Sequence, residues 1–304
     1  MKRVMARTSA SPERSEGARP KQSRAASVFL ACFAALAMTI SLVFLPRLSH
    51  ADAPPLITIA DGTYRVATPP NWDGKQPLPL VLYLHGFRED SAKIMARDDL
   101  VDAATQMGAL FVVPDGVDSG WSHAGAPSHK RDDIAFLHAV IADAETRYPV
   151  DRRRVFAAGF SIGASMVWDL ACHGAAGFAA FLPFSGDFWM PYPSGCESGP
   201  VDLRHTHADN DHTFPMGGRP LMGGKFHQGD LHQGMAILEA TDGCAVDADR
   251  QSRDGDLDCE SWSRCSSGKM IELCLHHEDH QIEGRWLKSG IDWALKSVAL
   301  AAKS

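Results

Sequence analysis

The sequence lacks internal repeats, a low-complexity linker and closely paired cysteines, and each absence argues against one class of structure. It has no internal repeat and no low-complexity linker, so nothing in it indicates a solenoid or a string of domains. None of its seven cysteines forms a C-x-x-C pair, which argues against a structural zinc site. The 304 residues are 45% hydrophobic and 22% charged, an ordinary globular composition. We therefore expect one domain of about 250 residues.

Positive charge is scarce beyond the N-terminal segment. The chain has a net charge of −7, but residues 1–51 hold eight Lys or Arg and two Glu, a local charge of +6. Residues 52–304 therefore carry −13. So acidic a domain is poorly suited to nucleic acid or to an anionic membrane surface, and we expect neither as a partner.

Residues 1–51 have the order of a signal peptide. A basic, polar stretch (1–24) precedes an apolar run (25–46), and Ser49-His-Ala51 offers small residues where a signal peptidase cuts. We expect cleavage before Asp52, giving a secreted or periplasmic domain of residues 52–304 without stable membrane association. The apolar run is also long enough to span a bilayer, so an uncleaved anchor is the alternative.

Cysteine usage agrees with export. Apart from Cys32 in the N-terminal segment, six cysteines remain, and four of them lie within residues 244–274. An even number of cysteines in an exported chain predicts disulfides. Six cysteines allow 15 pairings, and the residues alone do not choose among them.

Apolar runs alternate with stretches of helical spacing. Two short strands, 56–60 and 64–67, form a predicted hairpin. The expected buried strands are 78–84, 109–113, 155–158, 178–182, 201–207 and 270–275. The expected helices are 90–107, 130–148, 164–172, 229–240 and 285–301. This alternation predicts an α/β fold, a mostly parallel sheet with helices on both faces, which binds ligands at the carboxyl ends of its strands.

A G-x-S-x-G motif, Gly159-Phe-Ser161-Ile-Gly163, lies between an expected strand and an expected helix. This context is typical of a nucleophile elbow, in which a sharp turn lifts the serine hydroxyl out of the sheet. The two glycines allow the strand and the helix to pack closely. We expect Ser161 to be a nucleophile, and the alternative is a serine that only caps the helix.

A nucleophilic serine on this fold needs an acid and then a histidine further along the chain. His280, in the loop between the last strand and the last helix, is the expected base. His276 and His277 lie closer to the strand end and are expected to pack or hydrogen-bond locally. Asp209 and Asp211 both follow an earlier strand, and the residues alone leave the acid open between them.

Two backbone amides are expected to bind the oxyanion that forms during attack. One belongs to Ile162, directly after the nucleophile, and the other to Phe87, after the strand 78–84. Aromatic side chains in the loops form an expected substrate wall, with plain core packing as an equal alternative. They are Trp121, Phe188, Trp189 and Tyr192.

The fourteen histidines also raise the question of a metal. His205-x-His207-x-Asp209 is similar to the start of a metal-binding H-x-H-x-D-H pattern, but Asn210 stands where the last histidine belongs. Strand alternation places His205 and His207 on one face. We expect no catalytic metal and no cofactor.

The motifs follow one another in the order of a known family. They are Pro79–Gly86, Val112–Gly116 followed by Trp121, Asp132–Phe136, the elbow, Asp211–Pro215 followed by Gly217-Gly218, and Glu278–His280. Over about residues 56–298 the chain resembles the α/β-hydrolases that are similar to polyhydroxybutyrate depolymerases and feruloyl esterases. The resemblance implies a single-domain α/β-hydrolase fold. It implies Asp211 as the acid, because the acid of that family lies three positions before a V-P-Y-like tripeptide. It also implies disulfides within residues 244–274 and allows one between Cys172 and Cys196.

The resemblance implies an exported serine hydrolase that cleaves carboxylic esters. Phe87, Phe160 and Ile162 differ from the residues common at these positions in the family and make the mouth of the site bulkier. No polymer-binding domain is recognised after residue 301, which favours soluble or oligomeric esters, such as hydroxyalkanoate oligomers or feruloyl-type esters. The alternatives are a polyhydroxybutyrate depolymerase proper, a serine peptidase and a non-catalytic binding protein.

Overall fold

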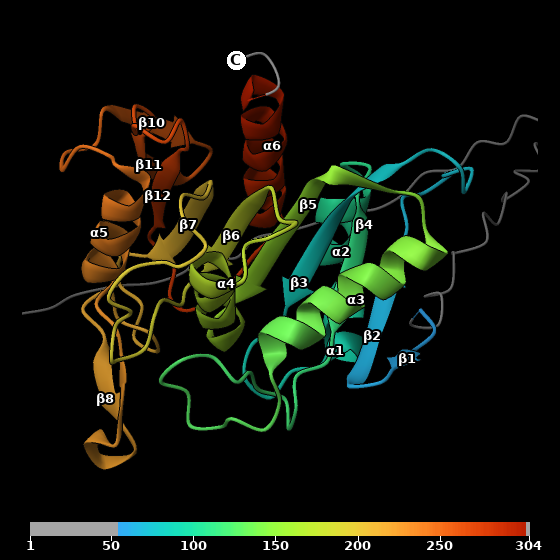
Figure 1. Cartoon of the computed structure of the whole chain (residues 1–304), viewed down its shortest axis with the longest axis horizontal. Helices are drawn as coiled ribbons and strands as arrows, with labels where there is room; N and C mark the ends of the chain where they lie inside the picture. Colours follow the sequence, from blue (N-terminus) through green and yellow to red (C-terminus); the bar gives the residue numbers. More distant parts are fainter. Residues whose placement is uncertain (1–53, 302–304) are drawn as a thin grey trace, which may run out of the picture. The chain divides into compact units, whose positions relative to one another are not determined.

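Parallel strands form the centre of the sheet in residues 54–301, the part of the chain that the computed structural model describes. The expected signal segment and its cleavage point lie outside these residues. The central strands are β4 (Leu110–Pro114), β3 (Leu78–Leu84), β5 (Val150–Phe160), β6 (Ala180–Phe184), β7 (Leu203–Ala208) and β12 (Ile271–His276). They are parallel neighbours in that order, which confirms the mostly parallel sheet (Figure 1).

Antiparallel strands extend both edges of this sheet. One edge carries β2 (Gly62–Ala67) and β1 (Ile57–Ile59), the expected hairpin. The other edge carries β11 (Leu257–Trp262) and β10 (Arg250–Asp254), which the sequence analysis missed. β10 reads RQSRD and is mostly exposed, a polar edge strand without the apolar pattern that would have revealed it.

Full burial explains why the central strands were recognisable. Every residue of β3 and β4 is buried, as expected for strands covered on both faces. Pro79 lies inside β3 without breaking it, because the pairing of β3 with β5 is irregular between Leu78 and Leu80. A central strand accepts proline at such an irregularity, where no ladder hydrogen bond is lost.

Helices cover both faces of the sheet, as predicted. α3 (Asp133–Arg147), α4 (Ile162–His173) and α5 (Leu231–Asp242) pack on the face that includes Leu80 and Leu82 of β3. α1 (Ser91–Met95), α2 (Asp98–Thr105) and α6 (Gly284–Ala301) pack on the face that includes Val81 and Tyr83 (Figure 1). Successive residues of one strand point to opposite faces, so β3 alone contributes to both cores.

The single helix expected over 90–107 is wrong, because the chain leaves helical geometry at Arg97, between α1 and α2. The Arg97 side chain donates to Asp99 and to the carbonyl of Ile282. Asp99 in turn accepts from the amide of Gly284, the first residue of α6. The residues at the break thus connect the start of α2 to the start of α6. The helical spacing of apolar residues continues across the break, so the sequence pattern does not indicate it.

Two further hairpin strands lie outside the main sheet. β8 (Arg219–Leu221) and β9 (Phe226–Gln228) pair antiparallel around a short 3-10 turn, Met222–Gly224. An isolated bridge joins Trp189 to Gln228, so the hairpin contacts the loop after β6. Neither strand was predicted, because three-residue strands carry too little pattern.

Three disulfides confirm the expectation from the cysteine count. Cys172–Cys196 joins the last turn of α4 to the loop after β6. Cys244–Cys265 joins the end of α5 to the loop after β11, and Cys259–Cys274 links paired positions of β11 and β12. Two of the three therefore lie within 244–274, as the family resemblance implied.

Candidate active site

Ser161 stands at a sharp turn between β5, which ends at Phe160, and α4, which begins at Ile162. Its backbone has φ 56° and ψ −122°, a conformation that non-glycine residues rarely adopt. The Ser161 amide donates to the Phe184 carbonyl at 2.9 Å and ties the turn to β6. A Cβ on Gly163 would lie 2.1 Å from the Leu84 carbonyl oxygen, so the turn excludes a side chain there.

Asp211 and His280 reach Ser161 from two other strands of the parallel sheet. Asp211 follows β7, and His280 follows β12, so all three residues lie beyond the carboxyl ends of parallel strands of one sheet. The distance from Ser161 Oγ to His280 Nε2 is 2.9 Å, and that from His280 Nδ1 to Asp211 Oδ2 is 2.7 Å. With Nδ1–H donating to the carboxylate, Nε2 is left to accept the serine proton.

The Asp211 carboxylate is held rigidly and is fully buried. Its Oδ1 accepts the backbone amides of Thr213 and Phe214 at 2.8 and 2.7 Å. Burial raises the pKa of Asp211, but the hydrogen bonds from His280 and Phe214 outweigh it and hold the pKa below its ordinary value. The carboxylate is therefore ionised at neutral pH and fixes the orientation of the imidazole.

The rival residues take other partners. Asp209 accepts from His277 at 2.6 Å, and both side chains are exposed. His276 is buried and stacks on Trp286, and burial lowers its pKa to about 4. His276 and His277 were expected to pack or hydrogen-bond locally; His276 does stack on Trp286, whereas His277 bonds to Asp209 on the loop after β7.

The two amides expected to bind an oxyanion belong to a helix start and to a turn. Ile162 is the first residue of α4, and Phe87 lies in the turn after β3. Neither amide donates to another group within residues 54–301. His85 braces the same turn, because its Nε2 accepts the Gly116 amide at 3.0 Å and its carbonyl accepts the Trp121 indole.

Most of the expected aromatic wall is buried. Trp121, Phe188 and Trp189 are 1%, 3% and 6% exposed, so the core-packing alternative holds for these three side chains. Trp189 donates to Ser165, and Phe188 packs edge-on against Trp168. Tyr192 is partly exposed, and its hydroxyl accepts the Asp230 amide at 2.5 Å.

Two aromatic residues that were not predicted to bind substrate lie in the motifs of the site, at the elbow and in the turn after β3. The Phe160 ring lies 4.8 Å from the His280 ring, centroid to centroid, and the Phe87 side chain is 60% exposed. Their places in the motifs, directly before the serine and directly after His85-Gly86, were the available signal. Loop composition pointed instead to the aromatic residues after β6.

His205 and His207 do not offer free ligand atoms for a metal. All four of their ring nitrogens are within hydrogen-bond distance of a partner in the buried interior. Within the described residues one other group has ligand-like spacing, Cys259, Glu272 and Cys274, but its two cysteines form a disulfide.

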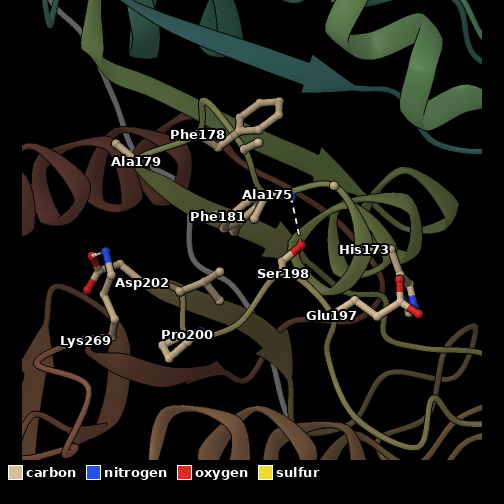
Figure 2. A pocket seen from close by; sticks show the side chains of 13 residues that line it. His173, Ala175, Phe178, Ala179, Phe181, Glu197, Ser198, Pro200, Asp202 and Lys269 are labelled. Carbon is tan, nitrogen blue, oxygen red and sulfur yellow. Dashed lines mark hydrogen bonds and ion pairs between the residues drawn. The ribbon is translucent and has the colours of Figure 1, made fainter.

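A cavity of about 490 Å³ opens at the other end of the parallel strands, where their amino ends lie. Figure 2 shows its lining, which comes from the segments that precede β6, β7 and β12. Lys269 pairs with Asp202 there at 2.9 Å, and the Ala175 amide donates to Ser198. The lining includes none of the three residues Ser161, Asp211 and His280, so this cavity is separate from the candidate active site.

Comparisons with known proteins agree with the fold. No model of a protein family matches the sequence. Feruloyl esterase C of Emericella nidulans is 30% identical over 170 residues, which cover 54% of this chain and 60% of that protein. The probable feruloyl esterase C of Aspergillus niger is 29% identical over 162 residues, 51% of this chain and 57% of that protein. The match thus spans about three fifths of these curated relatives.

Solved structures show the same architecture. A thermostable esterase superposes with a TM-score of 0.54 at 16% identity, covering 81% of this chain and 63% of that one. A mutant feruloyl esterase module from Clostridium thermocellum, complexed with sinapinate, gives 0.53 at 14% identity, covering 80% and 86%. At such identities the likeness establishes the fold. The chain therefore has the α/β-hydrolase fold, and its sequence is similar to those of feruloyl esterases.

Proposed function

We propose that this protein hydrolyses carboxylic esters through an acyl-enzyme on Ser161. The observation that carries the proposal is the continuous series Ser161–His280–Asp211, joined at 2.9 and 2.7 Å. A serine hydroxyl becomes a useful nucleophile only beside an oriented base, and this geometry supplies one. The curated relatives, named as feruloyl esterases, support ester chemistry.

The mechanism follows from the positions of the side chains. Ser161 Oγ attacks the ester carbonyl while His280 Nε2 takes its proton, and buried Asp211 pairs with the imidazolium that forms. The amides of Phe87 and Ile162 stabilise the oxyanion. His280 then protonates the departing alcohol, and a water molecule, deprotonated by His280, releases the acid and restores Ser161.

We propose soluble or oligomeric esters as substrates, with feruloyl-type esters first. The Phe160 ring against His280 places apolar aromatic surface beside the serine, and exposed Phe87 lies in the turn after β3, which suits an aryl acyl group. Hydroxyalkanoate oligomers are the second class, because the motifs also resemble those of polyhydroxybutyrate depolymerases.

We further propose that the protein acts outside the cytoplasm. Three disulfides form and persist in an oxidising compartment, which supports export. In residues 54–301 no helix combines the length and apolar character that crossing a membrane requires. N-terminal sequencing of the protein recovered from a periplasmic or medium fraction tests the export. A first residue of Asp52 is expected, and an intact N-terminus would favour the anchor.

A substrate panel tests the activity. Methyl ferulate, p-nitrophenyl acetate and butyrate, a hydroxybutyrate oligomer and a peptide amide are offered to residues 52–304 and to Ser161→Ala. Ester turnover that is lost in the variant is the expected result. Preferred cleavage of the amide would instead favour a peptidase. A folded protein that cleaves no member of the panel would contradict the proposal and favour a binding protein.

A further inference from the structure

Two buried histidines of β7 lie directly behind the Asp211 turn. His205 and His207 are both inaccessible to solvent, and their ring centroids are 5.1 Å apart on the same face of the strand. Trp168 Nε1 lies 3.2 Å from His205 Nδ1, and His205 Nε2 lies 2.8 Å from His207 Nδ1. His207 Nε2 lies 2.8 Å from the Phe214 carbonyl oxygen. The side chains form one continuous series of hydrogen bonds from α4 to the loop after β7.

The indole at the head of this series fixes the direction of every hydrogen bond. Trp168 Nε1–H is a donor only, so His205 Nδ1 must accept and its Nε2 must carry the proton. His207 Nδ1 then accepts from His205, and its Nε2–H donates to the Phe214 carbonyl. The chemistry of the partners therefore determines one tautomer for each imidazole.

The same series keeps both imidazoles neutral. A second proton on His205 would face the indole N–H, and a second proton on His207 would face the His205 N–H. Burial acts in the same direction, because it lowers the pKa of both histidines, and of His205 most strongly. A permanent, uncharged donor thus points at the Phe214 peptide.

The Phe214 residue connects His207 to Asp211 through its two backbone hydrogen bonds. Phe214 accepts from His207 through its carbonyl and donates to Asp211 Oδ1 through its amide at 2.7 Å. His207 Nε2 is also 3.6 Å from Asp211 Oδ2, the oxygen that accepts from His280. His207 therefore contacts the turn that holds the carboxylate, and Asp211 lies between it and His280.

We propose that His207 is a positioning residue that fixes Asp211 against His280, with Trp168 and His205 holding its donor in place. This role rests on the proposed ester hydrolase function, because Asp211 matters to the reaction only if His280 is the base. The H-x-H pattern that resembles a metal motif in the sequence is then a hydrogen-bonded support for the acid.

Two substitutions at the same position separate the effect of losing the hydrogen bonds from the effect of changing the side-chain volume. His207→Phe keeps a ring but removes both polar nitrogens, whereas His207→Gln keeps a neutral donor and an acceptor. His138→Phe is the matched control, because His138 also bonds a carbonyl and packs on an aromatic ring, but on α3.

His207→Phe is expected to lower kcat by about 10- to 100-fold with KM changed less than about threefold, since small misplacement of an oriented group costs rate rather than binding. His207→Gln is expected to recover kcat to within about fivefold, and His138→Phe to leave it within about twofold of wild type. An equal fall of kcat in His207→Phe and His207→Gln, or a rise of KM with kcat unchanged, would overturn the positioning role.

A second readout needs no substrate. The His280 Nδ1 proton, in its hydrogen bond to Asp211, gives a low-field proton resonance, assigned by its loss in Asp211→Asn. We expect this resonance to shift or broaden in His207→Phe and to return in His207→Gln. A wild-type protein that hydrolyses no ester refutes the proposed function, yet its resonance still reports whether His207 orders the pair.

Trp168→Phe provides the test if His207→Phe does not fold. It keeps an aromatic ring at this buried position but removes the indole N–H at the head of the series, so His205 is free to change tautomer. A fall in kcat of about threefold or more, together with a changed low-field resonance, is expected. An unchanged resonance and an unchanged kcat in folded Trp168→Phe would overturn the proposal.

Discussion

Ser161 and His280 are 119 positions apart in the sequence, and Ser161 Oγ lies 2.9 Å from His280 Nε2. The sheet makes this approach possible, because β5 and β12 end at the same edge with β6 and β7 between them. β5 and β12 are three strand positions apart in the sheet, and the segment between β12 and α6 carries His280 back to Ser161. The proposed chemistry depends on this single contact.

Asp211→Asn is expected to lower kcat by about 10⁴-fold, because an amide in place of the carboxylate favours the wrong imidazole tautomer. Asp209→Asn is the matched control, since Asp209 pairs with exposed His277. Steady-state kinetics on one p-nitrophenyl ester compares them. A larger loss of kcat in Asp209→Asn than in Asp211→Asn would show that Asp209, and not Asp211, is the acid.

Gly163→Ala is expected to destroy the elbow. The added Cβ would lie 2.1 Å from the Leu84 carbonyl oxygen, a backbone atom that does not yield easily. Thermal unfolding is expected to show a loss of about 1–3 kcal/mol, with activity reduced further. Gly195→Ala, where a Cβ meets nothing within 4 Å, is the control. Equal effects of the two substitutions would contradict the packing argument.

The sequence identified those parts of the fold whose pattern is local. β3, β4 and the strand–turn–helix around Ser161 were predictable because apolar runs and two glycines suffice to specify them. The break at Arg97 was not, because it depends on the Ile282 carbonyl, 185 positions away. Composition alone did not reveal that Trp121 and Trp189 turn into the core.

The acid illustrates the same limit within the site. Asp209 and Asp211 are two positions apart and chemically identical, so residue type did not separate them. Their surroundings in the structure differ, because only Asp211 receives the amides of Thr213 and Phe214 and the imidazole of His280, and this favours Asp211 as the proposed acid. The family resemblance favoured Asp211 in the sequence, through the position of the tripeptide that follows it.

Asp242 is expected to make stability fall as pH rises. It is buried at the end of α5, and burial raises its pKa to about 7, so the folded protein holds a proton that the unfolded chain loses near its ordinary value. The unfolded state therefore binds fewer protons between about pH 4 and pH 7, and the free energy of unfolding decreases over that window.

Asp242→Asn removes this dependence and is expected to gain about 1–3 kcal/mol relative to wild type at pH 8, with a smaller difference at pH 5. Urea unfolding at the two pH values measures both. The same difference at pH 5 and pH 8 would show that Asp242 does not titrate in this window.

The Cys259–Cys274 disulfide is expected to stabilise the edge of the sheet. It closes a separation of 15 residues between paired positions of β11 and β12. Replacing both cysteines by serine is expected to cost about 3 kcal/mol of unfolding free energy. Denaturant unfolding under non-reducing conditions compares the variant with wild type, and a midpoint that does not move would contradict this stabilising role.

The most direct test of the account is the site of acylation. The protein is mixed with p-nitrophenyl butyrate, quenched in acid during turnover and digested for mass spectrometry. We predict a butyryl group on Ser161, with none in Ser161→Ala and far less in His280→Ala, where the base that activates the serine is missing. Ester turnover that persists in Ser161→Ala, with the label on another residue or on none, would contradict Ser161 as the nucleophile.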